Sequence, residues 1–293
     1  MTLETLRTAL AAALASAGDT SPIRAIDRAG GGDINEAACV ETGHSRYFIK
    51  WNPRPLPGMF EVEARGLRLL RAANAVQTPA VIAVIDQPPA LLLEWIDSRG
   101  SKSDASEALG RLLAQQHRVL GASFGLDHDN YIGSNPQINQ PSARWIDFYR
   151  DRRLGAQMEL ARSNGHLNPK RARQIERLMS CLGEWIDEAN CAPSLLHGDL
   201  WGGNTMTGSH GEPVLIDPAV YYGDREAEIA FTELFGGFSS KFYAAYNEAW
   251  PLMPGYDVRR DLYNLYHLLN HLNLFGEGYG GSVDAILRRF VGE

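Results

Sequence analysis

The sequence LLHGDLWGGN occupies residues 195–204, and the sequence VLIDP follows at residues 214–218. In the first segment four residues separate Asp199 from Asn204, and in the second Asp217 follows a short apolar run. The two glycines between Asp199 and Asn204 allow a tight loop. Polar residues on loops that a rigid scaffold positions are typical of functional sites. We therefore expect this loop-rich region to carry the chemistry of the chain.

The order and spacing of these residues match the catalytic loop of kinases. Phosphoryl transfer from ATP needs a carboxylate near the attacking hydroxyl, oxygen ligands that hold Mg²⁺ against the phosphates, and a cation that orients the phosphate chain. A kinase loop places Asp and Asn at this spacing, and a second metal-binding Asp follows a short strand. Taken singly, Asp199 and Asn204 are typical turn residues, and His197 is a typical structural histidine. In this combination they favour phosphoryl transfer.

Upstream, one lysine and one helix supply the expected phosphate-binding residues. Lys50 ends an apolar strand predicted over residues 46–50, and a helix predicted from about residue 59 to 73 carries Glu63. A lysine held by a helix glutamate beside the nucleotide is how kinases fix the α- and β-phosphates. Glu61 is an alternative partner for Lys50, and the spacing leaves this choice open.

Two further stretches are candidates for nucleotide contacts. Three consecutive glycines precede the hairpin that ends at Lys50: Gly30, Gly31 and Gly32. Their backbone N–H groups suit phosphates, although they do not form a G-x-G-x-x-G motif and a simple hairpin turn is the alternative. Three residues follow the next apolar run, where a kinase hinge presents backbone groups to adenine: Glu94, Trp95 and Ile96.

The hydrophobic pattern predicts an α+β fold of the two-lobed protein-kinase-like type. Residues 1–93 read as a nucleotide-binding lobe, a small β-sheet with one key helix, and they include a hairpin over residues 81–93. Residues 94–104 are polar and serine-rich, which is typical of a hinge or linker. Residues 105–293 read as a larger, mostly helical lobe that contains the catalytic and acceptor site.

Composition excludes several classes of function. The chain has 293 residues with 28 Lys and Arg against 35 Asp and Glu, a net charge of −7, so no nucleic-acid partner is expected. No apolar run approaches the ~18 residues of a membrane span. The three cysteines are odd in number and lack metal-ligand spacing, which indicates a reducing, cytoplasmic environment. Cys39 is expected to be a buried inert thiol, with redox sensitivity as the alternative, and a monomer is favoured.

The chain resembles the fructosamine kinase (ketosamine-3-kinase) family, a branch of the aminoglycoside-phosphotransferase-like kinases. The motifs that carry the resemblance run along nearly the whole chain: GGGDINEA at 30–37, MFEVEARGL at 59–67, FGL at 124–126, NYIG at 130–133, WIDFY at 145–149, HGDLWGGN at 197–204, IDPAVYYG at 216–223, FGGF at 235–238 and HLLNHLN at 267–273. HGD-x-x-x-x-N is shared by many small-molecule kinases. The DLW triplet and the DPA-x-YYG motif are more particular to this family.

The resemblance implies an enzyme that uses ATP and Mg²⁺ to phosphorylate the 3-hydroxyl of a ketoamine, either a small molecule or a sugar on a protein lysine. Loss of the 3-phosphate by elimination then frees the amine, which is deglycation repair. The implied roles are catalytic base for Asp199, Mg²⁺ ligands for Asn204 and Asp217, phosphate binding for Lys50 and Glu63, and adenine contact for Glu94 and Ile96. We expect Trp201 to stack on the sugar, with a packed loop tryptophan as the alternative, and His197 to lie on the substrate side.

Several alternatives remain beside this prediction. Asp217 is followed by Pro218 and Ala219 rather than Phe-Gly, and no Ala-Pro-Glu follows, which argues against a switchable protein kinase. An aminoglycoside- or choline-type phosphotransferase would have the same fold, but residues 256–280 offer asparagines, histidines and tyrosines more than the carboxylates a polycation needs. A metal-dependent hydrolase would leave Lys50 unexplained. A nucleotide-binding pseudoenzyme would lack a catalytic residue, and none is missing.

Overall fold

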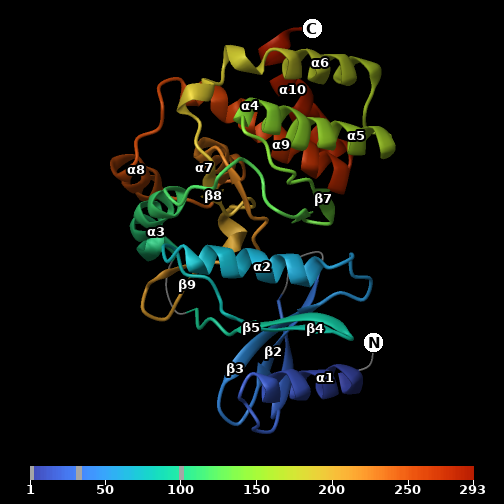
Figure 1. Cartoon of the computed structure of the whole chain (residues 1–293), viewed down its shortest axis with the longest axis vertical. Coiled ribbons are helices and arrows are strands. Elements are labelled where there is room, and N and C mark those ends of the chain that lie inside the picture. The colour runs from blue at the N-terminus through green and yellow to red at the C-terminus, as the bar shows by residue number, and fades with distance from the viewer. Residues whose placement is uncertain (1–2, 31–34, 99–101) are drawn as a thin grey trace. The chain divides into compact units, whose positions relative to one another are not determined.

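The computed structural model describes residues 3–30, 35–98 and 102–293, and the chain divides into two compact units (Figure 1). The first unit comprises residues 1–105 together with residues 206–217. The second comprises residues 106–205 and 218–293. Within the part of the chain that is described, no helix combines the length and apolarity needed to cross a membrane.

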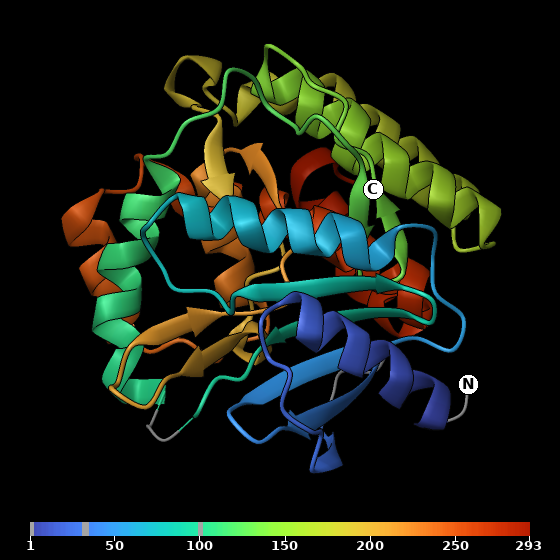
Figure 2. The same cartoon turned by 60° about the horizontal axis from the view of Figure 1, so that its bottom comes forward.

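The first unit is built on a five-stranded antiparallel sheet in the order β1-β2-β3-β5-β4. The strands are β1 (Ala25–Ala29), β2 (Glu36–Glu41), β3 (Arg46–Trp51), β4 (Val81–Asp86) and β5 (Pro89–Glu94). Strands β4 and β5 form the predicted hairpin. Helix α2 (Met59–Ala72) runs beside β4 and β5, as Figure 2 shows.

Helix α1 (Leu3–Ser16) covers one face of the sheet, and its contacts show to which face each side chain of β3 points. Its apolar stripe, which includes Leu6 and Leu10, packs in one cluster with Ile49 and Trp51 of β3. Side chains alternate along a strand, so Lys50 points to the opposite face. That face is the one on which α2 lies, because Lys50 forms an ion pair with Glu63 of α2.

Residues 206–217 belong to the first unit, whereas the predicted division placed them in the C-terminal lobe. They form a hairpin of β9 (Thr205–Thr207) and β10 (Pro213–Leu215). Val214 makes a parallel bridge with Gln77, and the Leu215 N–H donates to the Gln77 carbonyl at 2.8 Å. These backbone contacts fix the position of Asp217 relative to the sheet of the first unit.

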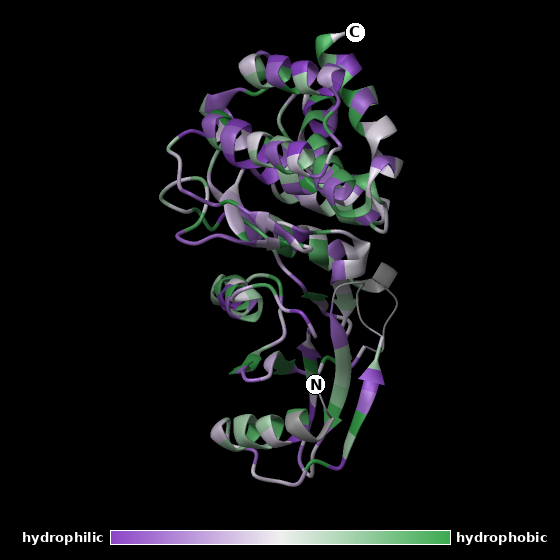
Figure 3. Cartoon of the chain, turned by 90° about the vertical axis from the view of Figure 1, so that its right-hand side faces the viewer, coloured by the Kyte–Doolittle hydropathy of each residue, from purple (hydrophilic) through white to green (hydrophobic). Residues whose placement is uncertain are grey.

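The second unit is mostly helical. Its helices are α3 (Lys102–His117, which starts in the first unit), α4 (Trp145–Phe148), α5 (Ala156–Ser163), α6 (Pro169–Ser180), α7 (Arg225–Leu234), α8 (Ser240–Ala249), α9 (Tyr256–Phe275) and α10 (Gly280–Val291). Helix α9 packs against α5, α7 and α10. Figure 3 shows hydrophobic and hydrophilic residues interleaved along the helices, as in amphipathic helices.

Two short antiparallel pairs of strands frame the loops of the second unit. Strand β6 (Asn130–Ile132) pairs with β7 (Asn135–Gln137), and β8 (Ser194–Leu196) pairs with β11 (Tyr221–Gly223). The segment HGDLWGGN begins directly after β8. The pairing of β8 with β11 therefore anchors the start of that loop.

Arg171 of α6 connects this helix to α10 and to the segment that contains Glu277, so its replacement tests how much these contacts stabilise the fold. Its side chain is 2% exposed, and its Nε and Nη1 atoms donate to Asp284 of α10 and to Glu277, each at 2.8 Å. We expect Arg171→Met to lower the free energy of unfolding by about 2 kcal/mol, less than for a fully buried pair because both carboxylates are partly exposed. Urea unfolding followed by circular dichroism measures this.

The matched control is Arg173→Met, on the same helix but at an exposed position. We expect the control to stay within about 0.5 kcal/mol of the unmodified chain. Equal losses from both variants would mean that the Arg171 ion pairs contribute nothing specific to stability.

Candidate active site

Lys50 is the centre of a charged cluster in the first unit. Its side chain is 6% exposed, and its Nζ lies 2.6 Å from Asp217 Oδ1. The same Nζ forms an ion pair with Glu63 Oε1. Glu61 is exposed, so the structure pairs Lys50 with Glu63 rather than with Glu61. One ammonium group is thus shared between two carboxylates.

The electrostatics of this cluster favour a further cation. Burial alone would lower the pKa of Lys50, but the charges of Asp217 and Glu63 raise it above its usual range, so Lys50 stays protonated. Burial raises the pKa of Glu63 to about 7, Lys50 opposes this shift, and Asp217 adds to it. With both carboxylates ionised, the cluster carries an excess of negative charge, which a bound cation would neutralise.

The backbone of Asp217 is held in an unusual conformation. Its φ is 53°, in the left-handed region that non-glycine residues rarely adopt, although Asp tolerates it better than most. Such a conformation costs of order 1 kcal/mol or more and is often found at functional sites. The side chain is 49% exposed, so it is accessible while its Oδ1 remains paired with Lys50. An accessible carboxylate held in a fixed direction suits a metal ligand.

The catalytic-loop candidates come together in the second unit. Asn204 Nδ2 donates to the Asp199 carbonyl oxygen at 2.8 Å and to Asp199 Oδ2 at 3.1 Å. Gly198, with φ 84°, makes the turn that leads from β8 into the loop. A Cβ on Gly198 would lie 1.9 Å from the Ala219 carbonyl oxygen, so only glycine fits there. The loop therefore presents the Asp199 carboxylate in a direction fixed by Asn204.

Trp201 and His197 occupy very different environments on this loop. The indole of Trp201 is 42% exposed and covers Gly203, where a Cβ would lie 2.2 Å from the ring. His197 is completely buried, and its Nδ1 accepts the Asp199 N–H at 3.3 Å. His197 thus contacts the backbone of the loop, and its position on the substrate side stays a prediction.

The hinge candidates lie at the end of β5 in the first unit. Glu94 pairs with Ala80, since its Oε2 accepts the Ala80 N–H at 2.9 Å. Arg46 lies over the ring of Trp95 at 5.5 Å from the centroid and forms an ion pair with Asp97. These contacts fix the segment that contains Ile96. Of the glycine triplet, Gly30 is exposed directly after β1, and Gly31 and Gly32 lie outside the described residues.

Glu228 was not among the predicted site residues, although it contacts the catalytic loop directly. It lies on α7, and its Oε1 accepts the Gly198 N–H at 2.6 Å. The only signal in the sequence is an acidic residue within the otherwise apolar stretch Ala227–Phe231. A charged residue in such a stretch is buried only when it is paired, which makes it a candidate for a specific contact.

Comparison with known proteins gives a consistent result. The sequence profile of the family described as "Fructosamine kinase" matches residues 6–293. The "Probable ketoamine kinase" of Lactiplantibacillus plantarum is 44% identical over 271 residues, which cover 92% of this chain and 95% of that protein. The "Protein-ribulosamine 3-kinase, chloroplastic" of Oryza sativa subsp. japonica is 41% identical over 282 residues, with 94% and 81% covered.

Solved structures of kinases have the same fold as this chain. A candidate fructosamine-3-kinase from Thermobifida fusca superposes with a TM-score of 0.87 at 31% identity, covering 98% of this chain and 99% of that one. An aminoglycoside phosphotransferase has a TM-score of 0.65 at 15% identity over 98% and 99% of the two chains. The predicted α+β, protein-kinase-like fold is therefore confirmed.

Proposed function

The chain belongs to the fructosamine kinase family and is a phosphotransferase with ATP as co-substrate, and we propose that it phosphorylates the 3-hydroxyl of ketoamines. Two observations carry the proposal: in the first unit Lys50 is shared between Glu63 and Asp217, and in the second unit Asn204 donates to the Asp199 carboxylate. The relatives named ketoamine kinase and ribulosamine 3-kinase support the class of acceptor. A cytoplasmic monomer that acts on small-molecule or protein-bound ketoamines is part of this proposal.

In the proposed reaction Asp199 accepts the proton of the attacking hydroxyl. The sugar 3-oxygen forms a bond to the γ-phosphorus, the bond to the β-phosphate oxygen breaks, and ADP leaves with that electron pair. The proton ends on the Asp199 carboxylate and passes to solvent. Lys50 orients the α- and β-phosphates, and Glu63 holds Lys50 in place. Elimination from the product then releases the 3-phosphate as inorganic phosphate, and hydrolysis of the remaining imine by water frees the amine.

The residues present fit Mg²⁺ as the accompanying cation. Asp217 carries a half-exposed carboxylate in a cluster with excess negative charge, and Asn204, whose Nδ2 donates to Asp199, carries an amide oxygen. These are the hard oxygen ligands that Mg²⁺ prefers, and the bound ion would neutralise charge on the phosphates. We therefore propose Asn204 and Asp217 as its protein ligands.

Trp201 is the proposed contact for the sugar of the acceptor. An exposed indole face that covers the catalytic loop suits the C–H side of a carbohydrate. We expect Trp201→Ala to raise KM for the ketoamine about tenfold, which corresponds to about 1.4 kcal/mol, while KM for ATP changes by less than about twofold. Trp201→Phe should recover part of the loss. Steady-state kinetics with each substrate varied in turn measure both constants, and an equal rise in the two would exclude an acceptor role.

The test of the proposed function is a panel of acceptors. The purified protein is incubated with Mg·ATP and the lysine adducts of fructose, ribulose and erythrulose, with kanamycin and choline as acceptors of the alternative class. Mass spectrometry detects the transferred phosphate. Transfer to a ketoamine supports the proposal, and relative kcat/KM values identify the preferred sugar. Transfer to kanamycin or choline alone would replace it with the alternative acceptor class.

A further inference from the structure

Residues 276–279 connect α9 to α10 in the second unit, and we call them the connecting segment. Their sequence is GEGY, and Gly280 begins α10 directly after them. Gly276 ends α9 with a φ of 85°, in the left-handed region that favours glycine. Glycine loses more backbone freedom on folding than any other residue, so contacts from other elements have to hold this segment in one conformation.

Arg171 of α6 supplies such contacts. Its side chain is 2% exposed, and it donates from Nη1 to Glu277 Oε1 at 2.8 Å and from Nη2 to Glu277 Oε2 at 3.1 Å. The same guanidinium donates to the two oxygens of Asp284 on α10, at 2.8 and 3.1 Å. Two parallel hydrogen bonds fix the plane of a carboxylate as well as its position. Arg171 therefore holds Glu277 of the connecting segment against α6.

The missing side chain of Gly280 makes room for this ion pair. A Cβ on Gly280 would lie 2.1 Å from Glu277 Oε2 and 2.6 Å from Arg171 Nη2. The backbone of Gly280 is helical, with a φ of −59°, so alanine is compatible with its conformation. A methyl group at this position would thus displace the ion pair while both charged residues stay in the chain.

The connecting segment also places Tyr279 among other rings. The Tyr279 ring centroid lies 5.1 Å from that of His271 and 6.1 Å from that of Phe275, both on α9. Phe235, directly after α7, has its ring centroid 4.7 Å from that of His271. We call these four residues the aromatic cluster. Phe235 is 42% and Phe275 56% exposed, so the cluster presents flat apolar faces to solvent.

The aromatic cluster adjoins the catalytic loop. Phe235 is followed by Gly236 and Gly237, and a Cβ on Gly237 would lie 2.9 Å from Gly202 Cα. Gly202 follows Trp201, the proposed sugar contact. Glycine permits so close an approach of two backbones because it has no side chain. Trp201 and Phe235 therefore lie on two loops that touch.

We propose that the aromatic cluster binds the aliphatic chain of the amine that carries the sugar, and that Arg171 and Glu277 form a latch that holds Tyr279 in this cluster. The proposal rests on the proposed function and concerns the part of the acceptor beyond the sugar. A ketoamine of lysine joins the sugar to a chain of methylene groups. With the sugar on Trp201, the neighbouring rings remove these methylene groups from water. Arg171 and Glu277 are positioning residues and do not touch the acceptor.

Two alanine substitutions at the start of α10 test the latch. Gly280→Ala displaces the ion pair, whereas a Cβ on Gly281 would meet no atom within 4 Å among the described residues. Both substitutions add one methyl group to the first turn of the same helix and favour that helix equally. We expect hydrogen exchange of peptides that span residues 274–281, read by mass spectrometry, to be at least fivefold faster in Gly280→Ala and unchanged in Gly281→Ala. Equal exchange in the two variants would overturn the latch.

The kinetic effect should fall on one constant. We expect Gly280→Ala and Glu277→Ala to raise KM for the lysine adduct of fructose about tenfold, while kcat and KM for ATP stay within about twofold. Asp284→Ala removes the other partner of Arg171, which lies on α10 and outside the connecting segment, and should leave all three constants unchanged. An equal rise of this KM in Asp284→Ala would mean that general loosening of Arg171, and not the latch, causes the effect.

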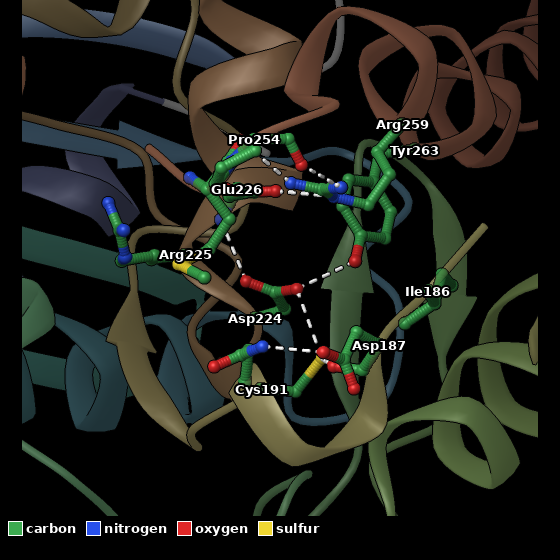
Figure 4. A pocket seen from close by; sticks show the side chains of 11 residues that line it. Ile186, Asp187, Cys191, Asp224, Arg225, Glu226, Pro254, Arg259 and Tyr263 are labelled. Carbon is green, nitrogen blue, oxygen red and sulfur yellow. Dashed lines mark hydrogen bonds and ion pairs between the residues drawn. The ribbon is translucent and has the colours of Figure 1, made fainter. Parts of the chain in front are cut away.

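A second arginine controls for loss of stability by itself. Arg259 of α9 donates from Nε to Glu226 Oε2 at 2.7 Å, in the lining of the pocket that Figure 4 shows. We expect Arg259→Met to lower the melting temperature because it leaves the buried Glu226 carboxylate without this partner, and to leave KM for both substrates unchanged. A rise of KM for the lysine adduct in this variant would count against a specific role of the latch.

The length of the amine chain tests what the aromatic cluster binds. We expect Tyr279→Ala to raise KM for the lysine adduct of fructose about tenfold and KM for the methylamine adduct, which lacks the chain, by less than about twofold. An equal rise for both adducts, or none for either, would overturn the binding of the chain. Phosphorylation of the methylamine adduct shows in the same experiment that the proposed function holds. If neither adduct is phosphorylated, the proposed function fails and the bound chain with it, whereas hydrogen exchange, which needs no acceptor, still decides the latch.

Discussion

Asp199→Asn is expected to lower kcat for ketoamine phosphorylation by about 10³-fold while KM for ATP stays within about twofold. The substitution keeps the shape of the side chain, and Asn204 can still donate to it, but the amide no longer accepts the proton of the attacking hydroxyl. Binding of ATP does not depend on that proton transfer. Initial rates from the appearance of ADP, checked by the mass of the phosphorylated product, measure the effect.

The control for this prediction is Asp257→Asn, which removes the same charge from a side chain of α9 that is 92% exposed. We expect its kcat to equal that of the unmodified chain. If Asp199→Asn kept more than about a tenth of the activity, the base would be another group or the transfer would need none. The first possibility predicts a shifted pH profile in Asp199→Asn, and the second predicts an unchanged one.

The contact between Asp199 and Asn204 could be predicted from the sequence because it is local. Asp199 and Asn204 are five positions apart, and the contact between them depends only on the turn that two glycines allow. Glu228 is thirty residues from Gly198, and nothing in the sequence indicates which buried backbone group a distant carboxylate accepts from. This contact between distant residues therefore emerges only in three dimensions.

The apolar pattern of α2 distinguishes Glu61 from Glu63 as the partner of Lys50. Residues on a helix two positions apart point about 200° apart, so at most one of them faces a given strand. The buried stripe of α2 includes Phe60, Ala64 and Leu67. Glu63 lies three residues after Phe60 and four before Leu67, on that stripe, whereas Glu61 lies off it. The apolar periodicity thus contained the answer that spacing from Lys50 left open.

Helix α10 begins with residues that are typical of turns. Gly280 and Gly281 open the helix, and glycine costs about 1 kcal/mol in a helix interior. Its buried residues Val283, Leu287 and Val291 repeat every four positions, which is a helical stripe. Tertiary packing of this stripe against α6 and α9 outweighs the low propensity of the start.

Lys50→Met is expected to lower kcat/KM for ATP on the order of 10³-fold, because it removes the cation that orients the phosphates. It also leaves the Glu63 carboxylate, 14% exposed, without its partner, so the variant should lose thermal stability as well. The double variant Lys50→Met/Glu63→Gln removes that unpaired charge. We expect it to regain most of the melting temperature and none of the activity, which separates the catalytic role of Lys50 from its structural one.

Glu63→Gln and Glu61→Gln complete this argument as a matched pair on one helix. Because Glu63 holds Lys50 in place, its substitution should lower kcat/KM for ATP about tenfold, and the exposed Glu61 should be replaceable without loss. Coupled-enzyme rates at varied ATP measure both variants. Equal losses would mean that Lys50 changes its partner when the nucleotide binds. Recovery of activity in the Lys50→Met/Glu63→Gln variant would instead mean that the lysine serves only to neutralise Glu63, because phosphate orientation cannot return with the cation absent.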